Sequence, residues 1–361
     1  MKKFNFILCL SIIIVGSAAG QKLKISNDNI GAGIEVGSRG VKFSIIKVDK
    51  ILHHFGFTYL KDGSINTQVI DFTSEAIEQT SRAVKAFYDT ILQYNKGIIP
   101  QNKIFIAVSS GVKQEANKKP GTEELLRIAI KHAVPKYTKS IEFLDPCTEG
   151  DLTIKGVVPT HYLYTSSLVD IGSGNTKGGF RMKNTKVAEC FNIPWGTSTL
   201  TKRLAKIPKD EAEKYFNDSI NPFIVIEVIK KRGLTNSKHN YFSGGIYWAI
   251  SNYLYPAKIK QDYTRLTPAD IDNFLNAAKN NYDSLINPDL SAIKNEVQLA
   301  EAKKQIERTH TTFTQDNLIA GGLIVRSIFT EFEKWGMKDK RYVFSRFAYV
   351  GWISGYIVEK L

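Results

Sequence analysis

The chain has 361 residues, of which 43% are hydrophobic, a formal net charge of +14 and three cysteines. This composition is that of a globular protein with enough apolar side chains to bury a full core, and the length suits two domains. So few cysteines exclude a framework of disulfides, and the absence of CxxC and HExxH spacings argues against zinc chemistry.

The positive charge has two explanations of equal weight. One is a polyanionic partner, such as polyphosphate, a nucleotide, nucleic acid or an anionic membrane surface. The other is a generally basic surface without a dedicated partner. Because the lysines are spread along the chain and do not cluster in one arm, no dedicated nucleic-acid binding is expected.

Residues 1–20 have the order of a secretory signal peptide. Lys2 and Lys3 precede an apolar run, Phe4–Val15, which ends in small residues up to Gly20. The run is short for a transmembrane span, although an uncleaved anchor is the alternative. We therefore expect an exported, periplasmic protein that has no transmembrane span after signal removal. Cys147 and Cys190 would remain and could pair in an oxidising compartment.

The first structural motif is a glycine hairpin at Gly33–Val48, GIEVGSRGVKFSIIKV. An acid, Glu35, lies between apolar residues and is followed by Gly37 and Ser38, after which an alternating strand resumes. The pattern then predicts an α/β unit with a mixed sheet. Its elements are a helix from Thr73 with Ser74 as N-cap, a strand at Lys103–Ser110, a helix from Thr122 to His132, a strand at Ile141–Leu144 and a helix containing Leu152 and Val157.

A second hairpin, Leu168–Phe180, repeats this pattern in LVDIGSGNTKGGF, with Asp170 as its acid. Two such hairpins suggest two similar halves that face each other. Glycine turns let backbone N–H groups approach an oxyanion, so a phosphate chain held between both turns is the simplest use of the pair. An ordinary hairpin is the alternative for either motif alone. The nucleotide loops GxxxxGK[ST] and GxGxxG are absent.

The second half then repeats the alternation of strands and helices. Two glycines, Gly244 and Gly245, end a predicted strand, and Thr267 with Pro268 marks a helix start. The further predictions are a strand at Lys186–Ile193, helices at Thr201–Leu204, Asp210–Phe216, Ala300–Arg308 and Asn317–Phe332, an ambiguous apolar segment at Phe223–Lys231, and an amphipathic closing helix at Arg346–Tyr356.

These motifs, in this order, resemble the exopolyphosphatase and guanosine-pentaphosphate phosphatase (Ppx/GppA) family of the actin-like ATPase superfamily. The segments that carry the resemblance are Gly33–Phe43, Val108–Asn117, Ile141–Val157, Leu168–Lys177, Ile193–Thr201, Phe242–Ile250 and Leu266–Leu275. The resemblance implies an α/β fold of two actin-like (ribonuclease H-like) domains, each a mixed sheet with flanking helices, around a central cleft. We place the domains at residues 21–158 and 159–361, with a final helix that can pack back on the first.

Several residues depart from the family pattern. Glu35 stands where the family usually has Asp, and Lys113 replaces an Arg, which loses a bidentate phosphate contact. The family's run of acids is reduced to Glu149, and Lys177 replaces an acid that closes the second loop. A metal site built from both hairpin acids would be weakened, or the lysine would take part of the metal's role.

The resemblance also implies a division of chemical roles. Glu35 and Asp170 are the expected Mg²⁺ ligands, directly or through water. Glu149 is expected to orient or deprotonate the attacking water, although alone it reads as an acid that stabilises a helix N-terminus. Lys113 and Arg39 are candidates for stabilising charge on the transferred phosphoryl group. The expected phosphate-binding residues are Gly37, Ser38, Arg39, Gly172, Ser173, Gly174, Asn175, Thr176, Gly244 and Gly245.

The expected function is hydrolysis of phosphoanhydrides in polyphosphate or a guanosine polyphosphate by an exported enzyme. One alternative is an apyrase-like nucleoside tri- or diphosphatase, because Glu35–Lys42, EVGSRGVK, resembles the DAGSSGTR of that family. The other is a phosphate-ligand-binding envelope protein that kept the fold and lost catalysis. The sequence does not choose between polyphosphate and nucleotide, and it leaves a homodimer open.

Overall fold

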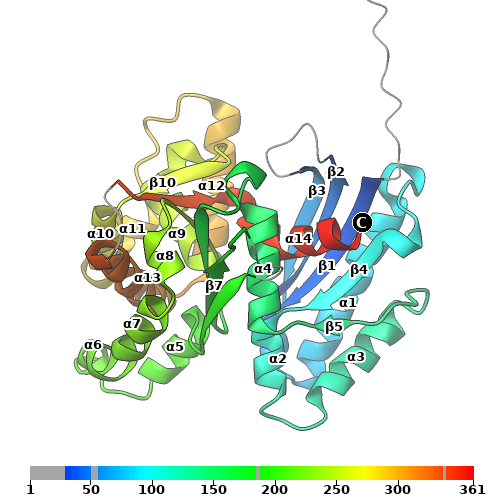
Figure 1. The fold of residues 1–361 in the computed structure, drawn as a ribbon, viewed down its shortest axis with the longest axis horizontal. Helices are drawn as coiled ribbons and strands as arrows, with labels where there is room; N and C mark the ends of the chain where they lie inside the picture. The colour runs from blue at the N-terminus through cyan, green and yellow to red at the C-terminus, as the bar shows by residue number, and fades with distance from the viewer. Residues whose placement is uncertain (1–28, 50–55, 184–187, 336–338) are drawn as a thin grey trace, which may run out of the picture.

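The computed structural model describes residues 29–49, 56–183, 188–335 and 339–361. It has the predicted α/β architecture: two mixed sheets, each with flanking helices, lie side by side (Figure 1). The predicted signal peptide, residues 1–20, lies outside the described residues. Among the described helices, none combines the length and the apolar character needed to cross a membrane.

The two sheets repeat one topology. In the first the strand order is β3-β2-β1-β4-β5, and in the second it is β8-β7-β6-β9-β11-β10. Each begins with an antiparallel three-stranded meander and continues with two parallel strands, so the predicted duplication is visible in the strand pairing; the second sheet adds β10, which pairs antiparallel with β11. The strands are β1 Ile30–Gly37, β2 Gly40–Val48, β3 Phe57–Asn66, β4 Ile104–Val108, β5 Glu142–Phe143, β6 Ser166–Ile171, β7 Thr176–Phe180, β8 Glu189–Ile193, β9 His239–Ser243, β10 Tyr263–Leu266 and β11 Arg341–Ser345.

Two helices fill the space between the sheets. Helix α4, Pro146–Val157, packs on β6, β7 and β8, while α14, Gly351–Lys360, packs on β1 and β2 (Figure 1). The two helices also pack on each other, and their backbones approach closely: a Cβ on Gly156 would lie 1.9 Å from the Gly351 oxygen. Glycine is required there because no side chain fits. The domain boundary at residues 158 and 159 stays a prediction.

Strand β1 explains why the central strands of these sheets have nearly continuous apolar sequences. All eight of its residues are buried, because α1 contacts the strand and α14 also packs on it. A strand covered on both faces does not alternate between apolar and polar residues. The acid Glu35 is therefore an exception within a buried apolar strand, and it calls for a chemical explanation.

Helix starts follow capping chemistry. The N-cap of α1 lies one residue earlier than predicted: it is Thr73, not Ser74, and its hydroxyl accepts from the Ala76 N–H at 3.1 Å. Thr267 caps α10 as expected. The remaining helices are α1 Ser74–Gln93, α2 Ser110–Ala116, α3 Thr122–Ala133, α5 Thr197–Leu204, α6 Ala212–Tyr215, α7 Asn221–Ile229, α8 Arg232–Asn236, α9 Gly245–Leu254, α10 Pro268–Asn280, α11 Tyr282–Ile286, α12 Glu296–Thr312 and α13 Gln315–Trp335.

Three details differ from the sequence reading. The ambiguous segment at Phe223–Lys231 belongs to a helix, α7, and two short strands, β10 and β11, were not predicted. The closing segment is a 3₁₀ turn, Arg346–Val350, followed by α14.

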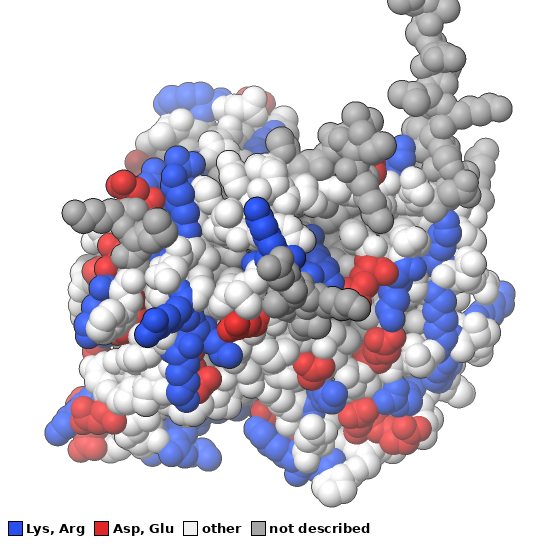
Figure 2. All heavy atoms as spheres, in the orientation of Figure 1, with Lys and Arg blue, Asp and Glu red and all other residues white. Residues whose placement is uncertain are grey.

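Lys and Arg side chains are spread over the face shown in Figure 2, where Asp and Glu side chains lie among them.

Candidate active site

A cavity of about 560 Å³ lies between the two halves of the molecule. Both acid–glycine hairpins line it, together with the first turn of α4 and the end of β9. It contains all predicted site residues except Lys113 and Thr176. These residues are Glu35, Gly37, Ser38, Arg39, Glu149, Asp170, Gly172, Ser173, Gly174, Asn175, Gly244 and Gly245.

The two hairpin turns converge on the start of α2. A Cβ on Gly111 would lie 3.1 Å from the Ser38 hydroxyl of the first turn, and a Cβ on Gly174 of the second turn would lie 3.2 Å from the Gly111 Cα. The amide of Asn175 donates to the Ser110 hydroxyl at 3.1 Å. Turns from separate halves of the chain thus form one surface of the cavity.

A buried lysine joins the acids of this site. The Lys177 ammonium lies 2.7 Å from Asp170 Oδ2 and 2.9 Å from Glu149 Oε1, and its side chain is only 4% exposed. Burial by itself lowers the pKa of a lysine, but the two carboxylates outweigh it and raise the pKa of Lys177 above its ordinary value. This environment favours the charged form of Lys177, which connects Asp170 of β6 with Glu149 of α4.

The other oxygens of these two acids are also engaged. The Ser243 hydroxyl donates to Asp170 Oδ1 at 2.8 Å, and the Ser110 N–H donates to Glu149 Oε2 at 2.5 Å. Burial alone would raise the pKa of Asp170, but Lys177 and the Ser243 hydrogen bond hold it below the ordinary value. Asp170 is therefore held in its ionised form, and both carboxylates are held in a fixed position.

The first hairpin carries a similar but looser pair. Lys42 Nζ lies 3.0 Å from Glu35 Oε1, and the lysine side chain is 31% exposed. Burial raises the pKa of Glu35, and the nearby charge of Glu149 adds to this, although Lys42 and a hydrogen bond from Trp352 partly offset both. Glu35 thus holds a proton more readily than a carboxyl in water does, in contrast to Asp170.

The sequence contains a signal that pairs each hairpin acid with a lysine, and our sequence-based prediction did not use it. The hairpins read EVGSRGVK and DIGSGNTK, so each acid is followed by a lysine at the same spacing. In both hairpins the acid and the lysine are direct partners across the ladder, Glu35 with Lys42 and Asp170 with Lys177. Directly opposed residues of an antiparallel pair share one face of the sheet, so the spacing alone pairs the charges.

Arg39, Lys113 and Thr176 have other partners. Arg39 lines the cavity and donates to the Thr312 carbonyl at 2.7 Å and to Asn317 Oδ1 at 3.0 Å, which ties the first turn to the second half. The Lys113 ammonium donates to the Phe143 carbonyl at 3.1 Å, and the Thr176 hydroxyl donates to the Trp195 carbonyl at 2.8 Å. The structure does not bring Lys113 or Thr176 to the cavity.

Three helices begin at the cavity, although the first N–H groups of one of them, α5, donate to the Gly172 and Ser173 carbonyls of the second turn. The three helices are α2, α5 and α9, whose first turns include the lining residues Gly111, Thr197 and Gly245. Helix N-termini favour anions. The entry to α9 requires glycine, because Gly244 has φ +102° and a Cβ there would lie 2.1 Å from the Ile171 oxygen. The site can therefore hold phosphate oxygens through backbone donors.

The outer wall of the cavity adds cations that the sequence reading did not select. Arg308 lies over the Trp248 ring at 5.4 Å, and Arg346 donates to Asn252 Oδ1 at 3.3 Å. Burial lowers the pKa of Arg346 to about 10, so it remains charged at neutral pH. These residues come from distant segments, α12 and the turn after β11, and no local pattern connects them to the hairpins.

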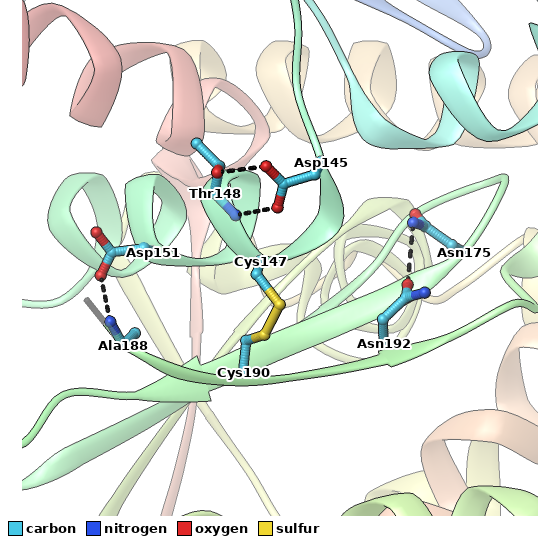
Figure 3. The surroundings of a disulfide bond; sticks show 8 residues. All are labelled: Asp145, Cys147, Thr148, Asp151, Asn175, Ala188, Cys190 and Asn192. Atoms are coloured by element: carbon cyan, nitrogen blue, oxygen red, sulfur yellow. Dashed lines mark hydrogen bonds between the residues drawn. A yellow bond between two sulfur atoms is a disulfide. The ribbon is translucent and has the colours of Figure 1, made fainter.

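A disulfide ties α4 to the second sheet beside this site (Figure 3). Cys147, in the first turn of α4, is bonded to Cys190 of β8, with a Cα–Cα distance of 5.4 Å. Asp145 caps the same helix by accepting from the Thr148 N–H at 2.9 Å (Figure 3). The helix turn that carries Glu149 is thus fixed by a cap and by a covalent bond.

The acids do not offer the ligand set expected for magnesium. Asp170 and Glu149 share the Lys177 ammonium, and Glu35 binds Lys42. Within the described ranges, no group of three or more His, Cys, Asp or Glu side chains could hold a metal ion. The residues present therefore do not fit a divalent cation between these carboxylates. Magnesium dependence stays a prediction.

Comparison with solved structures identifies the fold of this chain. No protein-family model and no curated protein matches the chain. Among solved structures, it is similar to a Ppx/GppA family member from Aquifex aeolicus, with 18% identity, a TM-score of 0.59, and coverage of 92% of this chain and 97% of that one. It is also similar to an exopolyphosphatase from Cytophaga hutchinsonii, with 15% identity, a TM-score of 0.61, and coverage of 91% and 96%. The resemblance seen in the sequence is confirmed at the level of the fold.

Proposed function

We propose that this chain is a phosphoanhydride hydrolase that releases phosphate from polyphosphate or a guanosine polyphosphate. The observation that carries the proposal is the meeting of both acid–glycine turns and Glu149 at one cavity. The fold it shares with a Ppx/GppA family member and with a structure described as an exopolyphosphatase supports the same activity. The twofold use of a glycine turn suits a ligand with several phosphate groups.

The proposed binding mode uses backbone donors and fixed cations. Phosphate oxygens would accept from the N–H groups of the two turns and of the helix starts at Gly111 and Gly245. Arg39 would add a guanidinium, since its recorded partners are a carbonyl and an amide oxygen and not a carboxylate. Both kinds of donor are in place before the ligand arrives, which favours charge stabilisation during the reaction.

In the proposed reaction, a water oxygen forms a bond to the terminal phosphorus. The bridging P–O bond breaks, its electron pair leaves on the shortened chain, and the water's proton passes to solvent or to a phosphate oxygen. Glu149 would orient the water by accepting a hydrogen bond from it. Each of its oxygens already accepts one donor, and a carboxylate oxygen can accept a second.

We also propose that the protein is exported, with residues 1–20 as its signal peptide. The disulfide between Cys147 and Cys190 supports this location, because such bonds persist in oxidising compartments. Mass spectrometry of the mature N-terminus is the test. A purified cytosolic protein that begins at Met1 would contradict export.

The test of function is phosphate release by the purified mature chain from polyphosphate, ATP, GDP and guanosine pentaphosphate, each with Mg²⁺ and with EDTA. The proposal expects release from polyphosphate or guanosine pentaphosphate. Preference for ATP and GDP would instead indicate an apyrase-like enzyme. Binding without turnover of any of the four would indicate a phosphate-binding protein that lost catalysis.

A further inference from the structure

The second hairpin holds a cation of its own at the centre of the site. Lys177 Nζ lies 2.7 Å from Asp170 and 2.9 Å from Glu149, two acids that belong to different elements, β6 and α4. We propose that Lys177 is the resident cation of this site and takes the position of a divalent metal between the two carboxylates, so that the chain binds phosphate ligands without a metal ion. This inference rests on the proposed function for the class of ligand.

The first support is that every oxygen of the two carboxylates already has a partner. Lys177 and the Ser243 hydroxyl take the two oxygens of Asp170, and Lys177 and the Ser110 N–H take those of Glu149. Magnesium needs oxygen ligands in near-ideal octahedral geometry. An ion at this place would have to displace the ammonium and break these contacts.

The second support is that the lysine cannot swing away. Its position on β7, directly opposite Asp170, is set by the β6–β7 ladder. Its residue is 3% exposed, and the third contact of its ammonium is Asn175 Oδ1 at 3.4 Å. That contact is the longest of the three, so it is the one a phosphate oxygen could replace without loss of either ion pair.

The third support is the charge of the whole cleft. The five acids that line it are outnumbered by six cations: the acids are Glu35, Asp62, Glu149, Asp170 and Glu301, and the cations are Arg39, Lys42, Lys177, Lys304, Arg308 and Arg346. A cleft of acids without these cations would repel a polyanion and would need a metal to accept it. With them, the cleft requires no added cation to admit phosphate.

The experiment counts Mn²⁺ bound to the full mature chain by electron paramagnetic resonance, without any phosphate ligand. We expect the wild type to bind no Mn²⁺ tightly. We expect Lys177→Ala to bind one ion per chain, and its thermal stability, lowered by the substitution, to rise when the ion binds. The matched control is Lys155→Ala. Lys155 also bridges two carboxylates, Asp151 and Glu359, but outside the cavity, and Asp151 keeps Arg181 as a partner.

Tight Mn²⁺ binding by the wild type would overturn the inference, and so would a folded Lys177→Ala chain that takes up no more ion than the control. If the alanine variant does not fold, Lys177→Gln, which is shorter than lysine but keeps a donor without the charge, replaces it with the same expected uptake. A second arm measures inorganic triphosphate binding in EDTA by calorimetry. Wild type and Lys155→Ala should bind it, and Lys177→Ala should bind about tenfold or more weakly, because one charged hydrogen bond is lost.

The two arms separate this inference from the proposed function. Absence of turnover with all substrates would remove the hydrolase proposal but would leave the Mn²⁺ count decisive for Lys177. Turnover that requires a metal, together with wild-type Mn²⁺ uptake, would keep the hydrolase proposal and remove the role of Lys177.

Discussion

The two acid–glycine hairpins share one register and differ in what their lysines do. Lys42 is partly exposed at 31% and pairs with one acid of its own hairpin, Glu35. Lys177 is 4% exposed and pairs with Asp170 of its own hairpin and with Glu149 of α4. The same local motif therefore forms a partly exposed ion pair within the first hairpin. In the second hairpin it forms a buried junction with helix α4.

The turns of the two hairpins also differ, and again it is the second hairpin that contacts other parts of the molecule. The first ladder continues to the pair Gly37–Gly40, so its turn is tight, whereas the second ends at Ile171–Thr176 and leaves an open turn. In that open turn, Asn175 reaches Ser110 of the first half. An open turn costs ladder hydrogen bonds, but it frees side chains to join the halves. The second hairpin thus organises the cleft, and changes there should have the larger effects.

The largest effect is expected for Glu149→Gln, which keeps the size of the side chain and removes the charge that Lys177 contacts. Turnover should fall by about 10²–10⁴, an effect as large as the loss of a residue that acts directly on the attacking water. Triphosphate binding should be largely kept. Steady-state phosphate release checks this, with the folded state confirmed by circular dichroism. Wild-type turnover in this variant would refute the role of Glu149.

Asp170→Asn should come next, as a change in stability. It leaves the buried Lys177 with one acid, so the free energy of unfolding should fall by about 3–5 kcal/mol, as when a buried pair loses one partner. The pKa of Asp170 is held below its ordinary value of 3.8, so its contribution is present above that pH and is lost as the pH falls through the folded-state pKa. Urea unfolding of both proteins at a series of pH values measures it. A variant as stable as wild type at pH 7 would show that the junction is not stabilising.

Breaking the disulfide should have a smaller effect. It closes a loop over a sequence separation of 43 residues and ties α4 to the sheet of the second hairpin alone. Replacing Cys147 and Cys190 by Ser should lower the free energy of unfolding by about 2–4 kcal/mol. Because α4 carries Glu149, we also expect reduced turnover. Urea unfolding with and without reductant measures the first effect. Equal stability of the reduced and oxidised chains would contradict it.

Much of this site could be predicted because its parts are local. An acid, a glycine turn and an alternating strand are adjacent in the sequence, so both hairpins and most of their cavity residues were found. Thr176 was misplaced because the turn ends before it: β7 begins at Thr176, and neighbours on a strand point to opposite faces, so Lys177 faces Asp170 and Thr176 does not.

The rest depends on tertiary contacts. The direction of Lys113 follows from the rotation of the short helix α2, which aims its ammonium at the Phe143 carbonyl of β5. Arg308 and Arg346 reach the cavity from segments far along the chain. The bridge from Lys177 to Glu149 could not be read from either motif alone, because it exists only when helix α4 packs on the second hairpin.

The smallest effect is expected for Glu35→Gln in the first hairpin, and its sign depends on pH. Lys42 is partly exposed and stays hydrated without its partner, so the free energy of unfolding should change by no more than about 1 kcal/mol at acidic pH. The pKa of Glu35 is raised above its ordinary value of 4.5, mainly by burial, so the folded chain binds this proton more tightly than the unfolded chain does. Wild-type stability should therefore fall as the pH rises from 4.5 through the folded-state pKa, while the glutamine variant lacks this loss. Urea unfolding of both proteins from acidic to neutral pH should show the variant gaining relative to wild type, in the opposite direction to Asp170→Asn. A variant that loses stability relative to wild type as the pH rises would mean that Glu35 is held ionised as firmly as Asp170, and the contrast between the two hairpins would not hold.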